Sequence, residues 1–147
     1  MKKTLLALAT AFLSTAAVLH AADFPKDSPP FSKDYAAVTK AAKENGKPMA
    51  LIFSATWCSL CQTMKKDVYP SAAVKPFHDK FNWSYLDITI DANDKLSDEL
   101  KIENVPSILF LSADGKVIDL QDAYANAEDT AKKLAEVLKK VEGAAKK

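Results

Sequence analysis

The run MALIFSAT, residues 49–56, constrains the fold more than any other part of this chain. It is apolar almost throughout and has the length of a β-strand, but it lacks the alternation expected of a strand with one solvent-exposed face. A continuous apolar strand of this kind is buried on both faces, so helices must cover both sides of its sheet. The run therefore predicts an α/β protein with a parallel or mixed sheet.

Patterns before and after this strand predict the remaining elements. A helix capped by Ser32 should run to about Glu44 and end at Asn45 and Gly46. After the strand we expect a helix from Cys58, with Leu60, Met64 and Val68 on one face, and a short helix around Pro76. A strand at 82–90, a helix at 91–102 and a hairpin of strands 107–111 and 116–120 should follow. The last expected element is a helix capped by Asn126, with one face formed by Ala131, Leu134, Leu138 and Val141. Early alternation and a late hairpin predict a mixed sheet between helices.

The chain of 147 residues has room for one domain of ordinary size. Its first residues are typical of a secretory signal peptide, with two lysines, an apolar stretch and small residues before Asp23. We expect residues 1–22 to be the signal peptide, cleaved near Ala21 or Ala22, rather than an uncleaved membrane anchor. Residues 23–31 then form an extended segment, 32–142 the folded domain and 143–147 a C-terminal tail.

Charge argues against nucleic acid as a partner. All 20 basic residues are lysines, and loss of Lys2 and Lys3 with the signal peptide would leave 18 of them against 19 acidic residues. A chain near neutrality has no electrostatic footprint for nucleic acid, and without arginine it cannot make the bidentate contacts that arginine makes to guanine and phosphate. The C-terminal lysines are expected to be a solvated helix face.

The chain has two cysteines, Cys58 and Cys61, in the spacing CxxC, which redox couples, zinc sites and haem attachment all use. A zinc site needs four ligands, and after signal cleavage the chain offers Cys58, Cys61 and His78, so an acidic residue would have to complete the set. Haem attachment requires histidine directly after the second cysteine, where Gln62 stands. Copper bound by the two thiolates and His78 has no supporting local motif.

A redox couple explains the position of the pair better than a metal site does. The expected strand ends near Thr56 and a helix begins at Cys58, so this cysteine lies at a helix N-terminus, where free N–H groups stabilise a thiolate. Cys61, one turn later, lies on the same face and should be more buried. Cys58 is then the attacking thiol and Cys61 the resolving one.

The motif TWCSLC after an apolar strand, followed at a distance by NVPSILFL, resembles the thioredoxin superfamily. The likeness extends from about Lys47 to Val141 and implies a three-layer sandwich with a mixed sheet of about four to five strands flanked by helices. The stretch DVYPSAAVKPF is most similar to exported thioredoxin-like domains, including the C-terminal domain of the transmembrane reductant carrier of the periplasm.

The resemblance also implies roles for three residues outside the cysteine pair. Pro106 matches the cis-proline of the family, which turns the backbone of Val105 towards the disulfide, where a substrate segment could pair with it. Trp57 matches the tryptophan before the first cysteine. We therefore expect Trp57, Val105 and Pro106 to contact substrate.

Three positions depart from the family pattern. Ile52 stands where many thioredoxins bury an acidic residue as proton acceptor for the second cysteine, so Cys61 would depend on water, on Glu103 or on another nearby acid. Ser59 and Leu60 between the cysteines match neither the reducing thioredoxins nor the strong oxidase, and Thr56 replaces an acid two residues before Cys58. An intermediate acidity is expected for Cys58.

These features lead to the hypothesis of a periplasmic or otherwise exported thiol–disulfide oxidoreductase that is monomeric and uses its own Cys58–Cys61 disulfide instead of a separate cofactor. Protein thiols and disulfides would be its substrates and a membrane reductant carrier its electron source, with reduction the expected direction. The alternatives are a thioredoxin-fold binding or assembly module with a disulfide that does not cycle, and a metallochaperone. A CxxC disulfide closes a short loop and so adds little stability, which argues against a purely structural role.

Overall fold

The computed structural model describes residues 23–146, so the predicted signal peptide lies outside the described residues. Four strands form one mixed sheet in the order β2-β1-β3-β4. The helices and strands are α1 (Tyr35–Asn45), β1 (Met49–Ser54), α2 (Ser59–Thr63), the π-helix η1 (Met64–Val68), the 3-10 helix η2 (Lys75–Phe77), β2 (Asn82–Asp87), α3 (Asp91–Glu99), β3 (Ser107–Leu111), β4 (Val117–Asp122) and α4 (Ala127–Ala145). The predicted three-layer α/β fold is confirmed.

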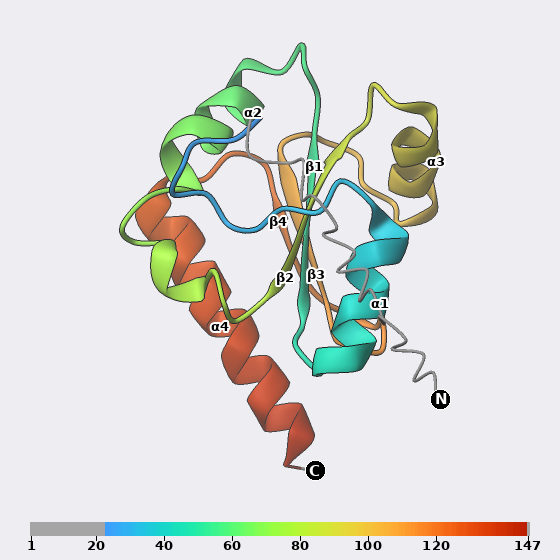
Figure 1. The fold of residues 1–147 in the computed structure, drawn as a ribbon, viewed down its shortest axis with the longest axis vertical. Helices are drawn as coiled ribbons and strands as arrows, with labels where there is room; N and C mark the ends of the chain where they lie inside the picture. Colours follow the sequence, from blue (N-terminus) through green and yellow to red (C-terminus); the bar gives the residue numbers. More distant parts are fainter. Residues whose placement is uncertain (1–22, 147) are drawn as a thin grey trace, which may run out of the picture.

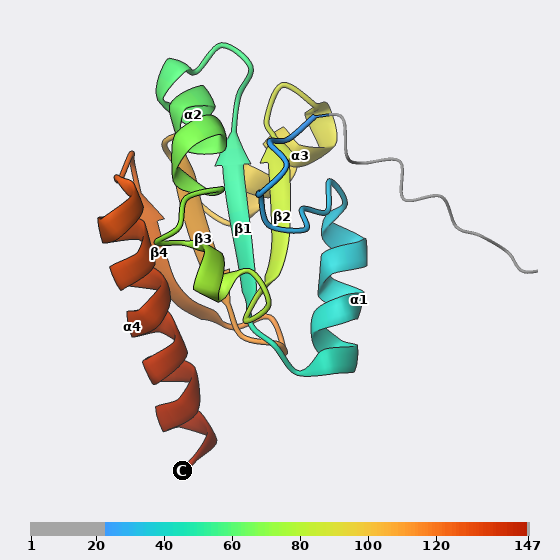
Figure 2. The ribbon, with the colours of Figure 1, turned by 60° about the vertical axis from the view of Figure 1, so that its left-hand side comes forward.

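Strand β1 lies inside the sheet and is buried along its whole length, as its apolar run predicts. It pairs in parallel with β2 and antiparallel with β3, and β3 pairs antiparallel with β4. Figures 1 and 2 show α1 and α3 on one face of the sheet and α2 and α4 on the other. Each face has its own hydrophobic core, with Ile52 in the core under α2 and α4 and Phe53 in the core under α1 and α3.

Helix α1 begins later than predicted, because Ser32 has another role. The Asp34 carboxylate caps α1 by accepting a hydrogen bond from the Ala36 N–H at 2.8 Å. The backbone of Ser32 instead pairs with β2, donating to the Trp83 carbonyl at 3.0 Å and accepting from the Tyr85 N–H at 2.8 Å. The predicted cap at Ser32 is therefore wrong, since a long-range strand contact uses that residue.

Other boundaries also differ from the sequence-based expectation. Strand β2 ends at Asp87 instead of Ile90, because the Asp87 carboxylate accepts a hydrogen bond from the Thr89 N–H and turns the chain. The helix after Cys58 changes to a π-helix at Met64, and Leu60 is exposed while Met64 and Val68 are buried. Strand β4 runs two residues further than expected, and α4 continues into the predicted tail as far as Ala145.

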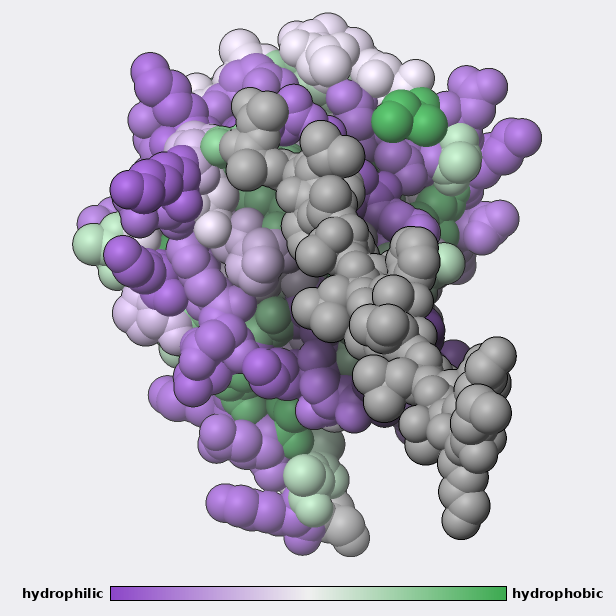
Figure 3. Space-filling model, viewed as in Figure 1, coloured by the Kyte–Doolittle hydropathy of each residue, from purple (hydrophilic) through white to green (hydrophobic). Residues whose placement is uncertain are grey.

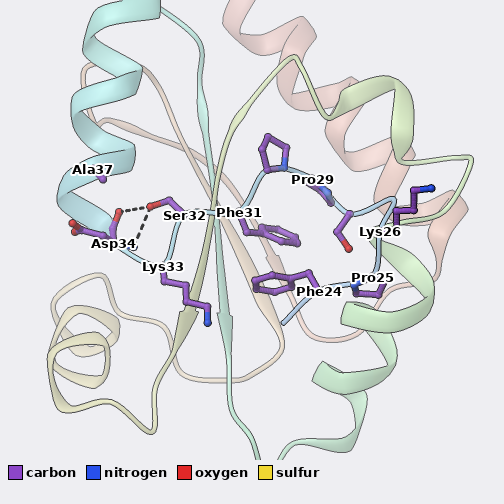
Figure 4. A pocket seen from close by; sticks show the side chains of 11 residues that line it. Phe24, Pro25, Lys26, Pro29, Phe31, Ser32, Lys33, Asp34 and Ala37 are labelled. Carbon is purple, nitrogen blue, oxygen red and sulfur yellow. Dashed lines mark hydrogen bonds between the residues drawn. The ribbon is translucent and has the colours of Figure 1, made fainter. Parts of the chain in front are cut away.

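The segment of residues 23–34, here called the N-terminal segment, lies on the α2 face of the sheet. Figure 4 shows the rings of Phe24 and Phe31 side by side, with centroids 4.7 Å apart. Phe31 is buried against Tyr69, Trp83 and Tyr85. The segment contains a turn and lines a hollow of about 890 Å³ near its prolines. Although residues 23–31 are predicted to precede the domain, Phe24 and Phe31 contribute to its core.

Two further findings concern the outside of the molecule. Where the surface in Figure 3 is described, it is mostly hydrophilic, and apolar residues occupy only small areas of that face. Among residues 23–146, no helix is both long enough and apolar enough to cross a membrane.

Candidate active site

The two cysteines lie where β1 ends and the next helix begins. Cys58 is the N-cap of α2, and its Sγ accepts a hydrogen bond from the Cys61 N–H at 3.1 Å. The two side chains form a disulfide, with Cα atoms 5.2 Å apart. The predicted position of Cys58 at a helix N-terminus is confirmed, and the Cys61 N–H in the first turn of α2 donates to the sulfur that would carry a thiolate.

A tight turn between β1 and α2 fixes the position of Cys58. Its N–H donates to the Ala55 carbonyl at 3.2 Å, and the side-chain amide of Gln62 donates to the same oxygen at 3.1 Å. Gln62 also donates its backbone N–H to the Cys58 carbonyl. These hydrogen bonds connect the end of β1 to the first turn of α2, so that the disulfide lies just beyond the end of β1.

The two cysteines differ in their access to solvent. Cys61 is 1% exposed and Cys58 is 8% exposed. Both pack with Ala55 in a small apolar cluster, against Ile88 and Val105. As predicted, Cys61 is the more buried cysteine, so a substrate sulfur has better access to Cys58.

The loop before β3 faces the disulfide. The peptide bond between Val105 and Pro106 is cis, as the resemblance implied. The Val105 carbonyl oxygen lies 3.8 Å from Cys58 Sγ. The Pro106 carbonyl accepts a hydrogen bond from the Ala123 N–H at 3.1 Å, which also brings Tyr124, 42% exposed, to this end of the sheet.

Side chains hold the same loop in place. The Ser107 hydroxyl lies 2.7 Å from the Asn104 carbonyl oxygen and 3.1 Å from Asp122 Oδ1, so it can donate to either. The Asn104 amide donates to both carboxylate oxygens of Asp122, at 3.3 and 3.4 Å. Position 105 is therefore fixed next to the cysteine by residues of β3 and β4.

A pocket of about 310 Å³ opens beside the disulfide. It is lined by Trp57, Ile88, Ser97, Ile102, Glu103, Asn104 and Val105. Trp57, directly before Cys58, is 71% exposed. The structure thus brings together all the predicted site residues, with Trp57 and Val105 lining the pocket and Pro106 buried behind Val105. Their roles in binding substrate stay predictions.

The position where many thioredoxins carry a buried acid is apolar here. Ile52 is fully buried in the core under α2. Two residues later, the Ser54 hydroxyl shares a buried hydrogen bond of 2.6 Å with the Tyr85 hydroxyl. Burial raises the pKa of Tyr85, while its bond with Ser54 acts in the opposite direction. Glu103 is exposed and lines the pocket, and its predicted role as proton acceptor for Cys61 stays a prediction.

The hydrogen bonds of His78 connect it to Tyr69 and Trp83. Its Nε2 lies 2.9 Å from the Tyr69 carbonyl oxygen, and its own carbonyl accepts from the Trp83 indole N–H at 3.1 Å. Within residues 23–146, no three or more His, Cys, Asp and Glu side chains are grouped so that they could hold a metal ion. The zinc and copper alternatives therefore gain no support from the described part of the chain.

Sequence reasoning missed two parts of this site. Ile88 packs against the disulfide because β1 and β2 are parallel and end at the same edge, where the Ile88 N–H donates to the Ser54 carbonyl at 2.9 Å. Parallel pairing of the two apolar strands was the signal that could have found it. The loop at Ala123 and Tyr124 follows β4 and carried no comparable signal.

Comparison with known proteins agrees with this geometry. The model of the thioredoxin-like domain family matches residues 35–138, which include both cysteines and Pro106. The chain is similar to the chloroplastic thioredoxin-like protein HCF164 of Arabidopsis thaliana, with 32% identity over 74 residues. That similarity covers 50% of this chain but only 28% of the length of HCF164.

Solved structures of two proteins have the same fold. DsbH oxidoreductase superposes with a TM-score of 0.65 at 21% sequence identity, covering 78% of this chain and 89% of DsbH. The DsbD C-terminal domain of Neisseria meningitidis is known in oxidised and reduced forms, with TM-scores of 0.61 and 0.60 at 22% and 21% identity. In both cases the matched region covers 69% of this chain and 90% of the DsbD domain.

Proposed function

Because the chain belongs to the thioredoxin-like domain family, we propose that it is a thiol–disulfide oxidoreductase that reduces disulfides of protein substrates. The observation that carries this proposal is the position of the disulfide. Cys58 caps a helix beside the cis-proline loop, while Cys61 is buried behind it. This arrangement supports a nucleophile and a resolving partner, and the similarity to an oxidoreductase structure agrees with it.

In the first step, the Cys58 thiolate of the reduced protein attacks one sulfur of a substrate disulfide. A new bond forms between Cys58 Sγ and that sulfur, the substrate S–S bond breaks, and the other substrate sulfur leaves as a thiolate and takes up a proton. The Cys61 N–H and the N-terminal end of α2 stabilise negative charge on Cys58. We therefore expect the pKa of the reduced Cys58 thiol to lie below that of a free cysteine.

In the second step, Cys61 loses its proton and attacks Cys58 Sγ. The intramolecular disulfide forms, the mixed disulfide breaks, and the second substrate thiolate is released and protonated. Two electrons and two protons have then passed from the Cys58–Cys61 dithiol to the substrate. Because Cys61 is 1% exposed among apolar side chains, its deprotonation should be the more demanding proton transfer.

A further cycle requires a dithiol donor that reduces the Cys58–Cys61 disulfide by the same exchange in reverse. We propose that this donor is a membrane reductant carrier and that the protein works outside the cytoplasm, in the periplasm of a double-membrane cell, after loss of residues 1–22. The basic start and apolar stretch of the sequence support export. The choice of donor rests on the resemblance of DVYPSAAVKPF to exported thioredoxin-like domains, and the similarity of fold to a DsbD domain agrees with that resemblance.

The reduction potential of the Cys58–Cys61 pair tests this proposal. The protein is equilibrated in glutathione and dithiothreitol buffers, and the fraction of reduced pair is measured by thiol alkylation. A value near that of thioredoxin, roughly −270 mV, supports a reductase. A value near roughly −120 mV would make the protein an oxidant of substrate thiols. A pair that does not cycle in either buffer would overturn the enzymatic function and favour the binding module.

A further inference from the structure

The pocket beside the disulfide carries an inference about the substrate, which rests on the proposed function. Val105 separates the pocket from the reacting sulfur, since it lines the pocket and its carbonyl oxygen lies 3.8 Å from Cys58 Sγ. Its volume of about 310 Å³ lies at the lower end of the range for ligand sites, roughly 300–1,000 Å³. A pocket of this size next to a reacting disulfide can receive one side chain of the substrate segment.

The polar side chains of the pocket, apart from the Trp57 indole N–H, offer hydrogen-bond acceptors. The Ser97 hydroxyl donates its hydrogen to the Asp94 carbonyl at 2.7 Å, which leaves only its lone pairs for a ligand. The Asn104 amide donates to Asp122, which leaves its Oδ1 as an acceptor. Glu103 supplies a carboxylate that is exposed and, among the described residues, has neither an ion pair nor a hydrogen bond.

The charge of the residues around the pocket also favours a cationic ligand. Residues 87–104, from the last residue of β2 through α3 to the loop before β3, contain six acidic residues and two lysines. Asp122 is already engaged by Asn104 and Ser107, and Glu103 is the acid among the residues that line the pocket, so Glu103 is the acid available to bind a ligand. The exposed face of Trp57 adds a surface on which a cationic group, arginine above all, can stack.

We propose that this pocket binds a basic side chain next to the reacting cysteine, so that the preferred substrates are disulfides flanked by arginine or lysine. A guanidinium group has five donors and no acceptor, which matches a set of acceptors beside an aromatic face. An acidic side chain at the same place meets Glu103 and is disfavoured. The selectivity lies in the formation of the mixed disulfide with Cys58.

The test uses blocked tripeptides Ac-X-Cys-X-NH2, oxidised to symmetrical disulfides, with X as Arg, Gln or Glu. The fully reduced protein is mixed with each peptide, and the rate constant for its oxidation is followed by the change in tryptophan fluorescence or by alkylation. Each rate constant is divided by that for reduction of the same peptide by dithiothreitol alone. This division removes the effect of X on the reactivity of the peptide disulfide itself.

We expect the normalised rate for the Arg peptide to exceed that for the Gln peptide by roughly threefold to tenfold at low salt, and the Glu peptide to be slowest. Glu103→Gln should bring the normalised rates of the Arg and Gln peptides within about twofold of each other. The ratio of the two rates is the readout, because a loss of Glu103 as proton acceptor for Cys61 would slow all the peptides alike. Glu99→Gln, on the exposed surface of α3 outside this pocket, removes the same charge and should keep the preference.

Two results would overturn the pocket as the source of selectivity. One is equal normalised rates for all three peptides with the wild-type protein. The other is an equal loss of preference in Glu99→Gln and Glu103→Gln, which would assign it to the general charge of α3. If no peptide is reduced at any X, the proposed function fails, and the substrate preference fails with it.

Discussion

In Cys58, one sulfur atom is both a helix cap and the atom proposed to react. Caps are normally oxygen atoms of Ser, Thr, Asp or Asn, which accept from the N–H groups of the first turn. Here Cys58 Sγ accepts from Cys61, so the backbone that positions the resolving cysteine also contacts the proposed nucleophile. The two cysteines have different proposed roles, so substitution of each should have a different result.

Substitution of the resolving cysteine should stop the reaction at its intermediate. In Cys61→Ser, Cys58 can still attack a substrate disulfide, but no second thiol releases the product, so a mixed disulfide with the substrate accumulates. Mass spectrometry of the variant after mixing with a peptide disulfide measures the adduct. Cys58→Ser is the matched control and should form much less adduct, because Cys61 is buried. Equal adducts in both variants would contradict the assignment of Cys58 as the attacking thiol.

The buried hydroxyl pair of Ser54 and Tyr85 should contribute to stability. Tyr85→Phe leaves the Ser54 hydroxyl buried without this partner, and the loss should cost about 1–2 kcal/mol in the free energy of unfolding. Tyr69→Phe is the control, since the Tyr69 hydroxyl contacts only the weak acceptor Met64 Sδ at 3.8 Å. Urea unfolding of both variants measures the difference. An equal cost in the two variants would show that the Ser54 bond is not the cause.

At the scale of the elements, Asp119 of β4 joins the sheet to α4. Its Oδ2 lies 2.6 Å from Lys140 Nζ and 3.3 Å from Lys133 Nζ, and its Oδ1 accepts from the Leu120 N–H at 2.8 Å. Partial burial by itself raises the pKa of Asp119, but the hydrogen bond with Lys140, the Leu120 N–H and Lys133 together outweigh it and lower the pKa below its ordinary value.

This lowered pKa gives a pH-dependent prediction. A carboxyl group with a lower pKa in the folded state stabilises the fold above the unfolded pKa of about 3.9, and that stability is lost as pH falls through the folded value. Asp119→Asn should therefore cost about 1 kcal/mol near pH 7, a figure kept low because Lys140 is half exposed, and the difference from wild type should shrink below about pH 4.

Thermal unfolding between pH 3 and 7 measures that difference. Asp114→Asn is the control, since it removes a pair with Lys116 that is open to solvent and should change stability less. A difference between Asp119→Asn and wild type that persists unchanged at pH 3 would show that Asp119 acts through packing or its Leu120 hydrogen bond rather than through its charge.

The elements also show how far sequence reasoning reached. The strand at β1 and the position of Cys58 were predictable because both depend on local patterns, an apolar run and a strand-to-helix junction. The cap of α1 was mispredicted, since nothing local reveals that Ser32 pairs with β2, 52 residues later. The pocket containing Glu103 was not predictable for the same reason: α3, the cis-proline loop and the active-site turn meet only in the folded protein.

At the scale of the whole molecule, the domain consists of two cores on opposite faces of one sheet, and the site lies where the strands β1 and β2 end. The N-terminal segment extends the core on the α2 face. Phe24 and Phe31 cover Tyr85, and Lys65 of η1 lies over the Phe24 ring at 4.7 Å. The segment therefore stabilises the face that carries the active-site helix, without lining the pocket beside the disulfide.

Removal of the Phe31 ring should separate stability from activity. Phe31→Ala deletes a ring that is 7% exposed and contacts Phe24, Tyr69, Trp83 and Tyr85, and should lower the free energy of unfolding by about 3 kcal/mol. Phe24→Ala, at a half-buried ring, should cost less. Urea unfolding measures both.

Under conditions in which each variant stays folded, peptide-disulfide reduction should remain within about twofold of wild type, since a lost ring far from the chemistry changes stability rather than transition-state contacts. A large loss of rate in folded Phe31→Ala would instead mean that the N-terminal segment positions α2, and with it Cys58, for reaction.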